Sequence, residues 1–273
     1  ECSSASSQKE APAWLLSGAV ADSGAIDDEA IAEFRTAYFS GPSIRMAEPA
    51  GDVDGDGVAD MLLASSPLGG GYQAAALLSG PVTGSLTVED SAAAIFMVFY
   101  NDFDHQGPTA GGDVDGDGYS DVIVGSVGPS SSYFGTVYIF NGPLTGTHEM
   151  STADASIEGP HAESYFGWMV AVPGDVDGDG TNDLLLNARR DERWGSSSGA
   201  SYLVPGPVSG SNDVDDVFSS SFHGPSSSDM LRVGVGAGDV NHDGLIDLLV
   251  GAAQADGDAP TAGAAYLLLG NGA

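Results

Sequence analysis

Gly174-Asp175-Val176-Asp177-Gly178-Asp179-Gly180-Thr181-Asn182-Asp183, followed by Leu184-Leu185-Leu186, is the stretch that decides the fold. It places Asp at positions 1, 3, 5 and 9 of a short loop and Gly at position 6, directly before an apolar run. The same pattern occurs four times and begins at Asp52, Asp113, Asp175 and Asp239. The spacings of 61, 62 and 64 residues indicate a chain built from repeats.

The loop pattern is typical of a calcium site. Alternating aspartates in a tight turn bring several carboxylates to one point, and Ca²⁺ takes about 6–8 oxygen ligands in irregular geometry. Gly at position 6 permits the sharp turn, while position 7 varies freely, as expected if only its backbone carbonyl is used. A single acidic loop can be a solvated turn, but four copies in register favour metal binding.

The repeat differs from an EF-hand in its second half. Its first half fits D-x-[DN]-x-[DN]-G, but position 12 carries Leu63, Val124, Leu186 or Val250 instead of Glu. The closing carboxylate stands at position 9, and the apolar run after it predicts a buried strand rather than a helix. The fourth copy has Asn241 at position 3, which lowers its charge, so we expect this site to be the weakest.

The composition is strongly acidic, with 39 Asp and Glu against 7 Lys and Arg and a formal net charge of −32. Four bound Ca²⁺ ions would still leave a net charge of about −24. Nucleic acids and anionic membranes need a basic protein face, so we expect neither as a partner. A length of 273 residues with 42% hydrophobic content is sufficient for one or two domains with a core.

The N-terminal sequence bears on location. Residues 1–10 are predicted to be a flexible tail and residues 11–273 the repeat domain. Cys2 is the single cysteine, which excludes an internal disulfide, and no apolar run reaches the ~20 residues of a membrane span. Open calcium sites with affinities of about 10⁻⁴–10⁻³ M are typical of extracellular modules. We therefore expect an extracellular or bacterial cell-surface protein, with Cys2 as a candidate lipoprotein anchor.

Short strands recur together with the loops. An apolar segment leading into Gly appears five times, at 12–18, 76–81, 137–143, 201–207 and 265–270. In the third copy, strands are predicted at 166–172, 184–188 and 200–204, with a fourth, more polar strand at 213–223. Four strands in each repeat of about 62 residues predict an all-β fold, a β-propeller of four-stranded blades. A two-sheet sandwich is the alternative, but the regular period argues against it.

The number of blades stays open from the sequence. Four repeats allow a ring of four or five blades, or part of a larger ring. Residues 29–39 occupy the slot of a fourth strand and are predicted to complete the last blade, which would leave the strand at 12–18 surplus. Closure is expected because unpaired edge strands promote aggregation. A helix over 27–38 is the alternative for this segment.

Phe166-Gly167 before the third loop, together with the apolar strand after it and Gly199-Ala200-Ser201-Tyr202-Leu203-Val204, resembles the FG-GAP repeat. This repeat builds the calcium-binding β-propeller of integrin α subunits and of many secreted bacterial proteins. The resemblance covers 12–273 and implies about four Ca²⁺ ions, held by side chains at positions 1, 3, 5 and 9 and by the carbonyl at position 7. The implied ligands are Asp52, Asp54, Asp56, Val58, Asp60, Asp113, Asp115, Asp117, Tyr119, Asp121, Asp175, Asp177, Asp179, Thr181, Asp183, Asp239, Asn241, Asp243, Leu245 and Asp247.

Enzyme motifs in the sequence are weak. The stretch at 195–199 fits G-x-S-x-G, but it lies in a Ser/Gly loop between predicted strands, where a nucleophile elbow needs a helix after it. The sequence holds no HExxH, CxxC or P-loop pattern. We therefore expect no catalytic residues and no enzymatic activity.

Three of the seven basic residues, Arg189, Arg190 and Arg193, lie together beside Trp194. On so acidic a chain these four residues are the predicted partner contact, and a solvated loop with local ion pairs is the alternative. The sequence thus predicts a non-enzymatic, extracellular propeller with structural Ca²⁺ that binds a protein or a glycan, as in adhesion. The propeller domain of a secreted, calcium-dependent polysaccharide lyase or hydrolase is the alternative function.

Overall fold

The structure is a computed structural model that describes residues 13–16, 30–35, 44–65, 72–99, 109–127, 134–224, 226, 231–255 and 263–270. The described chain is almost entirely β, which confirms the predicted class. Its strands are β1 (Ala13–Leu16), β2 (Ala30–Arg35), β3 (Ile44–Gly51), β4 (Asp60–Ser65), β5 (Tyr72–Leu78), β6 (Gly84–Thr87), β7 (Ala94–Phe99), β8 (Thr109–Gly112), β9 (Asp121–Ser126), β10 (Thr136–Phe140), β11 (Gly146–Glu149), β12 (Ala155–Glu158), β13 (Phe166–Gly174), β14 (Asp183–Ala188), β15 (Ala200–Val204), β16 (Gly210–Asp213), β17 (Ser220–His223), β18 (Leu231–Gly238), β19 (Asp247–Ala252) and β20 (Ala264–Leu268). Short helical turns are α2 (Val88–Ser91), η1 (Met150–Thr152) and α3 (Val214–Val217).

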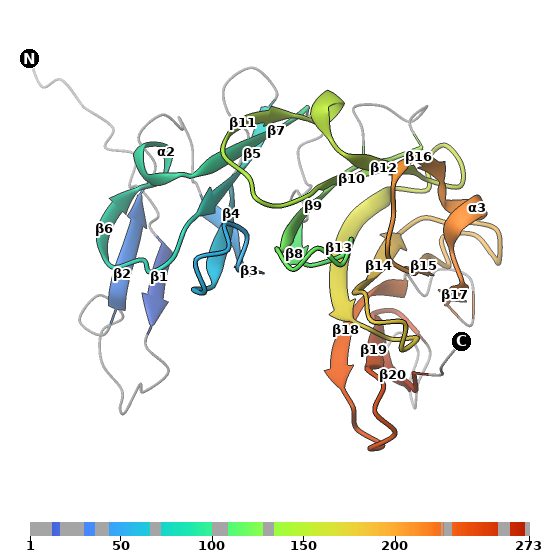
Figure 1. Ribbon diagram of the computed structural model, residues 1–273. Helices are drawn as coiled ribbons and strands as arrows, with labels where there is room; N and C mark the ends of the chain where they lie inside the picture. Colours follow the sequence, from blue (N-terminus) through green and yellow to red (C-terminus); the bar gives the residue numbers. More distant parts are fainter. Residues whose placement is uncertain are drawn as a thin grey trace, which may run out of the picture.

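The strands form five sheets, which we number along the chain. Sheet 1 has the order β1-β2-β6, sheet 2 β11-β7-β5-β4-β3, sheet 3 β16-β12-β10-β9-β8, sheet 4 β13-β14-β15-β17 and sheet 5 β18-β19-β20. They follow one another in an open arc with sheet 1 at one end and sheet 5 at the other (Figure 1). The first strands of successive repeats contact each other, β3 with β8, β8 with β13 and β13 with β18. This arrangement is propeller-like, because the innermost strands of blades surround a common axis.

The repeat predicted from the third copy is present, with one correction. Strands β13, β14 and β15 lie where the first three strands are predicted, and they pair antiparallel in that order. The expected fourth strand at 213–223 is instead two strands, β16 and β17, separated by the one-turn helix α3. Asp213 begins that helix, since its side chain accepts a hydrogen bond from the Asp215 N–H. Only β17 pairs with β15.

The extra short strand of each repeat joins the sheet of the preceding repeat. In the structure β6 pairs parallel with β2, β11 with β7 and β16 with β12. Each added strand covers the outer edge of its neighbour's sheet, which satisfies backbone groups that would otherwise form an exposed edge. The sequence predictions missed this strand because it is only four residues long and carries few apolar side chains.

The hydrophobic core is divided into layers between the sheets. Sheets 2 and 3 share a cluster that includes Leu77, Phe96 and Phe140, and sheets 3 and 4 share one that includes Ile139, Ile157 and Tyr202. Strand β14 is buried along its whole length, as the continuous apolar run after the loop indicates. Burial on both faces explains why the second strand of each repeat has no alternating pattern.

Close approach of the first strands restricts one glycine in particular. A Cβ on Gly111 of β8 would lie 2.4 Å from the carbonyl oxygen and 2.5 Å from the Cα of Ala50 on β3. Because these are backbone atoms, we expect Gly111→Ala to destabilise the protein by about 1–3 kcal/mol, the usual cost of overpacking. Gly251→Ala on β19 is the matched control, since a Cβ there meets nothing within 4 Å. Urea unfolding measures the free energy of unfolding of both variants. Equal values for Gly111→Ala and Gly251→Ala would contradict the tight contact between β3 and β8.

Residues 30–35 do not complete the last blade, which corrects the predicted closure for this part of the segment at 29–39. Residues 30–35 form β2, a strand rather than a helix, so the helical alternative is wrong for this part. Strand β2 pairs with β1 on one side and β6 on the other. The strand at 12–18 is therefore not surplus, because β1 is the direct partner of β2. Residues 29 and 36–39, like the predicted tail at 1–10, lie outside the described residues.

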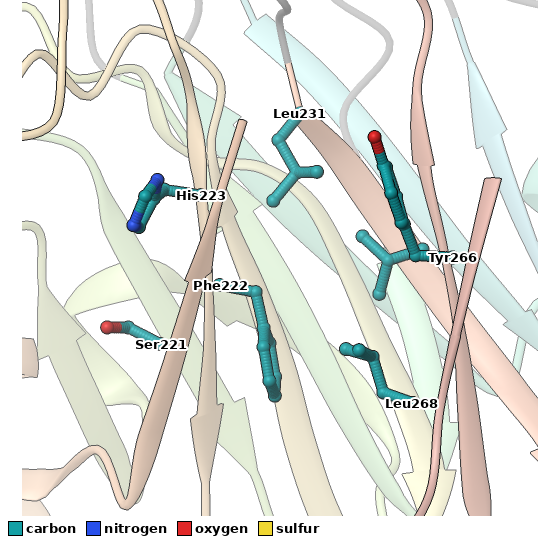
Figure 2. Close-up of a pocket in the computed structure, with 7 residues that line it drawn as sticks. Ser221, Phe222, His223, Leu231, Tyr266 and Leu268 are labelled. Atoms are coloured by element: carbon teal, nitrogen blue, oxygen red, sulfur yellow. The ribbon is translucent and has the colours of Figure 1, made fainter. Parts of the chain in front are cut away.

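A pocket of about 330 Å³ lies between sheets 4 and 5. Figure 2 shows Phe222 of β17 facing Leu231, Tyr266 and Leu268 of sheet 5 across this space. The lining of the pocket is mainly apolar, and the sequence did not predict this pocket.

Candidate metal centre

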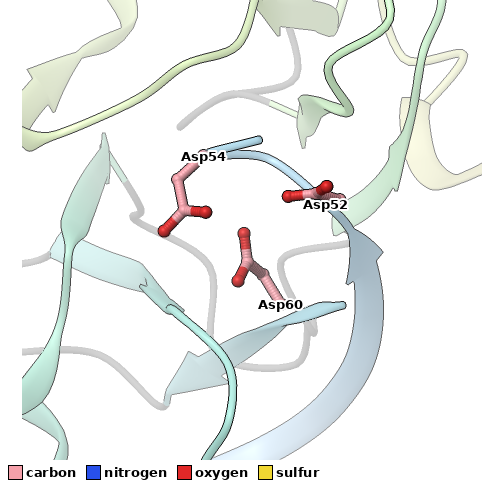
Figure 3. A group of neighbouring side chains, drawn as sticks. All are labelled: Asp52, Asp54 and Asp60. Carbon is pink, nitrogen blue, oxygen red and sulfur yellow. The ribbon is translucent and has the colours of Figure 1, made fainter. Parts of the chain in front are cut away.

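Each predicted metal loop lies between the first and second strands of a repeat, as expected. We name the loops I (52–60), II (113–121), III (175–183) and IV (239–247). In loops I, II and III, carboxylate oxygens of the aspartates at positions 1, 3 and 9 all lie within 4.8 Å of one another. Figure 3 shows Asp52, Asp54 and Asp60 of loop I turned toward a common point. Three carboxylates so close together form an oxygen cluster that can hold a metal ion.

Hydrogen bonds to the loop backbone hold the first carboxylate in place. In loop III, one oxygen of Asp175 accepts from the Gly178 N–H at 2.6 Å and the other from the Gly180 N–H at 3.0 Å. Loops I and II repeat both bonds. The bonds need a tightly curled backbone, and Gly180 at position 6 has φ +99°, which glycine adopts without strain.

The aspartates at position 5 of loops I, II and III are not part of the three-carboxylate groups whose oxygens lie within 4.8 Å of one another. Asp179 accepts hydrogen bonds from the Oγ1 and the N–H of Thr181, and these bonds lower the pKa of Asp179. The corresponding bond to the N–H of position 7 recurs in all four loops. Asp56, Asp117, Asp179 and Asp243 therefore support the turn, and their predicted role as ligands stays a prediction.

The aspartate at position 9 is buried and connects the loop to the end of the third strand. In loop III, Asp183 is fully buried, and its oxygens accept from the Val176 N–H at 2.8 Å and the Gly206 N–H at 3.2 Å. The other loops make the same pair of bonds, to the residue at position 2 and to the Gly that follows the third strand. This structural role was missed from the sequence. Its signal was the Gly that stands 20 to 23 residues after each closing Asp, at Gly80, Gly142, Gly206 and Gly270.

Burial raises the pKa of two of these carboxylates, Asp121 and Asp183. Desolvation raises the pKa of Asp121 to about 6 and that of Asp183 to about 6, and neighbouring aspartates of the same loop add to the effect. Backbone hydrogen bonds oppose the shift without cancelling it. The buried clusters thus favour neutralisation, either by a proton or by a cation.

A pH dependence follows for the metal-free protein. A pKa raised above the unfolded value of about 3.9 stabilises the fold at low pH, and this contribution is lost as pH rises through about 6. We expect the unfolding midpoint of metal-free protein to fall between about pH 4 and pH 6, because Asp121 and Asp183 become charged. With calcium present, ion binding requires the charged form, so the calcium-dependent gain should grow over the same range. Thermal unfolding by circular dichroism at each pH, with and without calcium, measures both trends, and parallel curves would contradict them.

Loop IV differs from the others in two ways. Asn241 replaces the aspartate at position 3, and its Nδ2 donates to Asp243 at 2.8 Å. His242 at position 4 adopts φ +63°, where the other loops have Gly55, Gly116 and Gly178. A non-glycine residue in this conformation carries strain of order 1 kcal/mol. The expectation that loop IV is the weakest site stays a prediction.

The four loops form one row, in which each loop contacts the next. The N–H at position 8 of each loop donates to the carbonyl at position 1 of the preceding loop, from Ser120 to Asp52, from Asn182 to Asp113 and from Ile246 to Asp175. The loop side chains also pack together, since a Cβ on Gly116 or Gly178 would touch the residue at position 7 of the next loop. The loops therefore support one another, and an ion in one loop is in a position to stabilise its neighbour.

The predicted partner residues lie in a loop that is braced by aromatic rings. The guanidinium of Arg189 lies 4.4 Å from the ring centroid of Trp168, and that of Arg190 lies 4.9 Å from that of Tyr165. Such cation–π contacts hold the side chains against the protein surface. The ring of exposed Trp194 stacks on His223, with centroids 4.9 Å apart and planes 6° apart.

A buried carboxylate anchors the same loop from below. Asp191 is fully buried and accepts from the Arg193 Nε at 3.3 Å and from the Tyr202 hydroxyl. Arg193 also donates to Asp215 at 2.6 Å, and His161 Nε2 lies 3.3 Å from Asp191. The alternative interpretation of this segment was a solvated loop with local ion pairs, and such ion pairs are present. Contact of the loop with a partner stays a prediction.

Two further sequence observations can be placed. The G-x-S-x-G stretch at 195–199 leads directly into strand β15 and not into a helix, which is unlike a nucleophile elbow. None of the helices in the described part of the chain has the length and apolar character to cross a membrane.

Comparison with known proteins identifies the repeat. Residues 113–186, which contain loops II and III, match the family described as FG-GAP-like repeat. The chain is similar to integrin alpha pat-2 of Caenorhabditis briggsae, with 38% identity over 101 residues, and of Caenorhabditis elegans, with 35% identity over 103 residues. Each match covers 36% of this chain and 8% of the relative's length. The chain therefore carries an FG-GAP-like repeat and an integrin α-like region, which confirms the resemblance seen in its sequence.

Proposed function

We propose that this chain is a non-enzymatic, calcium-binding, propeller-like module that binds a protein or glycan ligand outside the cell. The observation that supports it most is the row of loops in which three carboxylates converge on one point, three times over. The similarity to integrin α proteins over about a third of the chain supports a role in adhesion or ligand binding.

Calcium is the proposed ion because of the ligand chemistry. The clusters offer oxygen atoms alone, without Cys or His, and hard oxygen ligands in loops of this kind suit Ca²⁺. We propose the aspartates at positions 1, 3, 5 and 9, Asn241 in loop IV, and the carbonyls of Val58, Tyr119, Thr181 and Leu245 as ligands. Calcium is structural in this proposal, since it neutralises carboxylates such as Asp183 that also tie strands together.

The proposed ligand face is the braced basic loop. Arg190 and Trp194 are exposed there, and Arg193 lies between them. On a chain with a net charge of −32, a local group of arginines favours an anionic ligand, such as a carboxylated or sulfated glycan or an acidic peptide. Bracing by Tyr165 and Trp168 reduces the entropy that the arginines lose on binding.

A binding array tests the proposal. It carries acidic glycans, neutral glycans and acidic peptides, and the chain is applied to it in calcium and again after calcium has been removed. We expect calcium-dependent binding to acidic members, reduced tenfold or more by Arg190→Ala or Trp194→Ala. Arg35→Ala on β2 is the matched control, because it removes an arginine far from the loop and should leave binding unchanged. If the wild-type chain bound no glycan and no peptide of the array, the proposed binding function would be overturned. Release of glycan fragments during the experiment would overturn the proposal that the chain is not an enzyme.

A further inference from the structure

Loop II differs from loops I and III in what lies beside its aspartate at position 3. Asn141 follows strand β10 directly, and its Nδ2 donates to Oδ2 of Asp115 at 2.6 Å. The other oxygen of Asp115, Oδ1, accepts from the Asp117 N–H at 3.1 Å. Both oxygens of this carboxylate are therefore held, one by the loop itself and one by a residue that lies outside the loop.

The corresponding aspartates of loops I and III keep only the first of these bonds. Asp54 and Asp177 each accept from the N–H two residues further along the chain, at 3.2 Å and 3.1 Å. Within the described parts of the chain, neither accepts a hydrogen bond from a residue outside its own loop. The residues that correspond to Asn141 are Ser79 and Pro205, each directly before Gly-Pro, and neither side chain has an amide. The second bond is thus specific to loop II.

The turn that carries Asn141 is fixed against loop II. The N–H of Gly142 donates to the buried Asp121 of this loop at 3.0 Å. A Cβ on Gly142 would lie 2.7 Å from the carbonyl oxygen of Ser120, so the turn and the loop are in close contact. Because the backbone next to Asn141 is held in this way, its side chain reaches Asp115 from a fixed position.

An additional carboxylate lies beside the same asparagine. Asp154 accepts from the N–H of Asn141 at 3.0 Å. Ala93 and Ser219, which make the same backbone bond to the third strand as Asp154 does, carry no charge. Burial raises the pKa of Asp115, and the charges of nearby aspartates, Asp154 among them, add to this effect. Asp154 therefore adds a negative charge beside position 3 of loop II that the same positions of the neighbouring repeats lack.

The orientation of the Asn141 amide is determined by Asp115. If the amide were reversed, its oxygen would lie 2.6 Å from a carboxylate oxygen, and the two atoms would repel each other. In the observed orientation Oδ1 of Asn141 is buried and has no hydrogen-bond partner among the described residues. A buried acceptor without a partner lowers the stability of a fold. The bond to Asp115 is therefore the feature that explains an asparagine at this position.

We propose that Asn141 is a positioning residue for the calcium ion of loop II. This inference rests on the calcium binding proposed above. Repulsion from neighbouring aspartates would turn the Asp115 carboxylate away from the cluster that it forms with Asp113 and Asp121. The bond from Asn141 holds Asp115 in this cluster before an ion arrives, so loop II binds calcium about as tightly as loops I and III. Hydrogen bonds to metal-binding carboxylates typically contribute about 10–100-fold to metal affinity.

Calcium titration followed by NMR tests the inference loop by loop. The N–H groups of Gly57, Gly118 and Gly180 each donate to the first aspartate of their own loop. In protein labelled with ¹⁵N-glycine, their signals therefore report loops I, II and III separately. Asn141→Ser should raise the calcium concentration at the midpoint for Gly118 about tenfold and leave the other two midpoints nearly unchanged. Serine is too short to reach the carboxylate, and Ser79 occupies the same place in the preceding repeat, so the fold should accept it.

Ser79→Ala is the matched control and should shift none of the three midpoints, because Ser79 has no amide. Urea unfolding in metal-free buffer is the second measurement, and its midpoint should be the same for Asn141→Ser as for the wild-type chain. A lower metal-free midpoint would show a structural role, and it would overturn the inference alone. A Gly118 signal that titrates in Asn141→Ser as in the wild-type chain would do the same. If no glycine signal of the wild-type chain responded to calcium, the proposed calcium binding would be overturned together with the inference.

Discussion

Removal of calcium lowers the thermal unfolding midpoint of this protein by about 10 °C or more, which is the largest effect we expect. With a dissociation constant of about 10⁻⁴–10⁻³ M per site and calcium at about 10 mM, each occupied loop adds about 1.4–2.7 kcal/mol. At about 2–4 °C per kcal/mol for a domain of this size, three or four loops account for the shift. Differential scanning calorimetry with calcium and after exhaustive chelation measures it.

The control for this experiment is magnesium at the same concentration. Magnesium demands a small octahedral site and dehydrates reluctantly, so it should restore little of the lost stability in a loop of clustered carboxylates. Identical unfolding midpoints in calcium, magnesium and chelator would contradict a structural role for the metal.

Asp183→Ala lowers the free energy of unfolding by about 2–4 kcal/mol even in metal-free buffer. The substitution removes the acceptor for the buried N–H groups of Val176 and Gly206, and each unsatisfied donor costs about 1–3 kcal/mol. Relief of the desolvation that raises the pKa of Asp183 offsets part of this loss. Urea unfolding in the absence of calcium isolates the effect from metal binding.

Asp177→Asn in the same loop is the matched control. Asn keeps an oxygen that accepts from the Asp179 N–H, so metal-free stability should change by less than about 0.5 kcal/mol. The calcium-dependent gain should nevertheless shrink, because one negative ligand is lost. An Asp183→Ala protein that resembles Asp177→Asn in metal-free buffer would show that the buried carboxylate does not connect loop and strand.

The sequence predicted those parts of the fold that depend on local chemistry. The loop pattern, the buried strand after it and the third strand at Ala200–Val204 are all encoded within a few residues, and the structure confirms them. The convergence of the aspartates at positions 1, 3 and 9 also follows from the pattern, because alternate residues of a tight turn point inward.

The features that the sequence did not predict depend on contacts between repeats. Strand β16 is short and polar, and it becomes a strand because β12 of the preceding sheet offers a free edge. Strand β2 was assigned to the last sheet because its pattern fits a fourth strand, but pairing with β1 and β6 holds it in the first. Neither outcome can be read from a single repeat, since it depends on which neighbouring edge is available.

The number of calcium ions bound per chain tests the account most directly. Equilibrium dialysis at millimolar calcium, with the ion measured by mass spectrometry, should give about three ions of similar affinity and a fourth, weaker one that Asn241→Asp strengthens. A chain that remains folded under these conditions and binds no calcium would contradict the account.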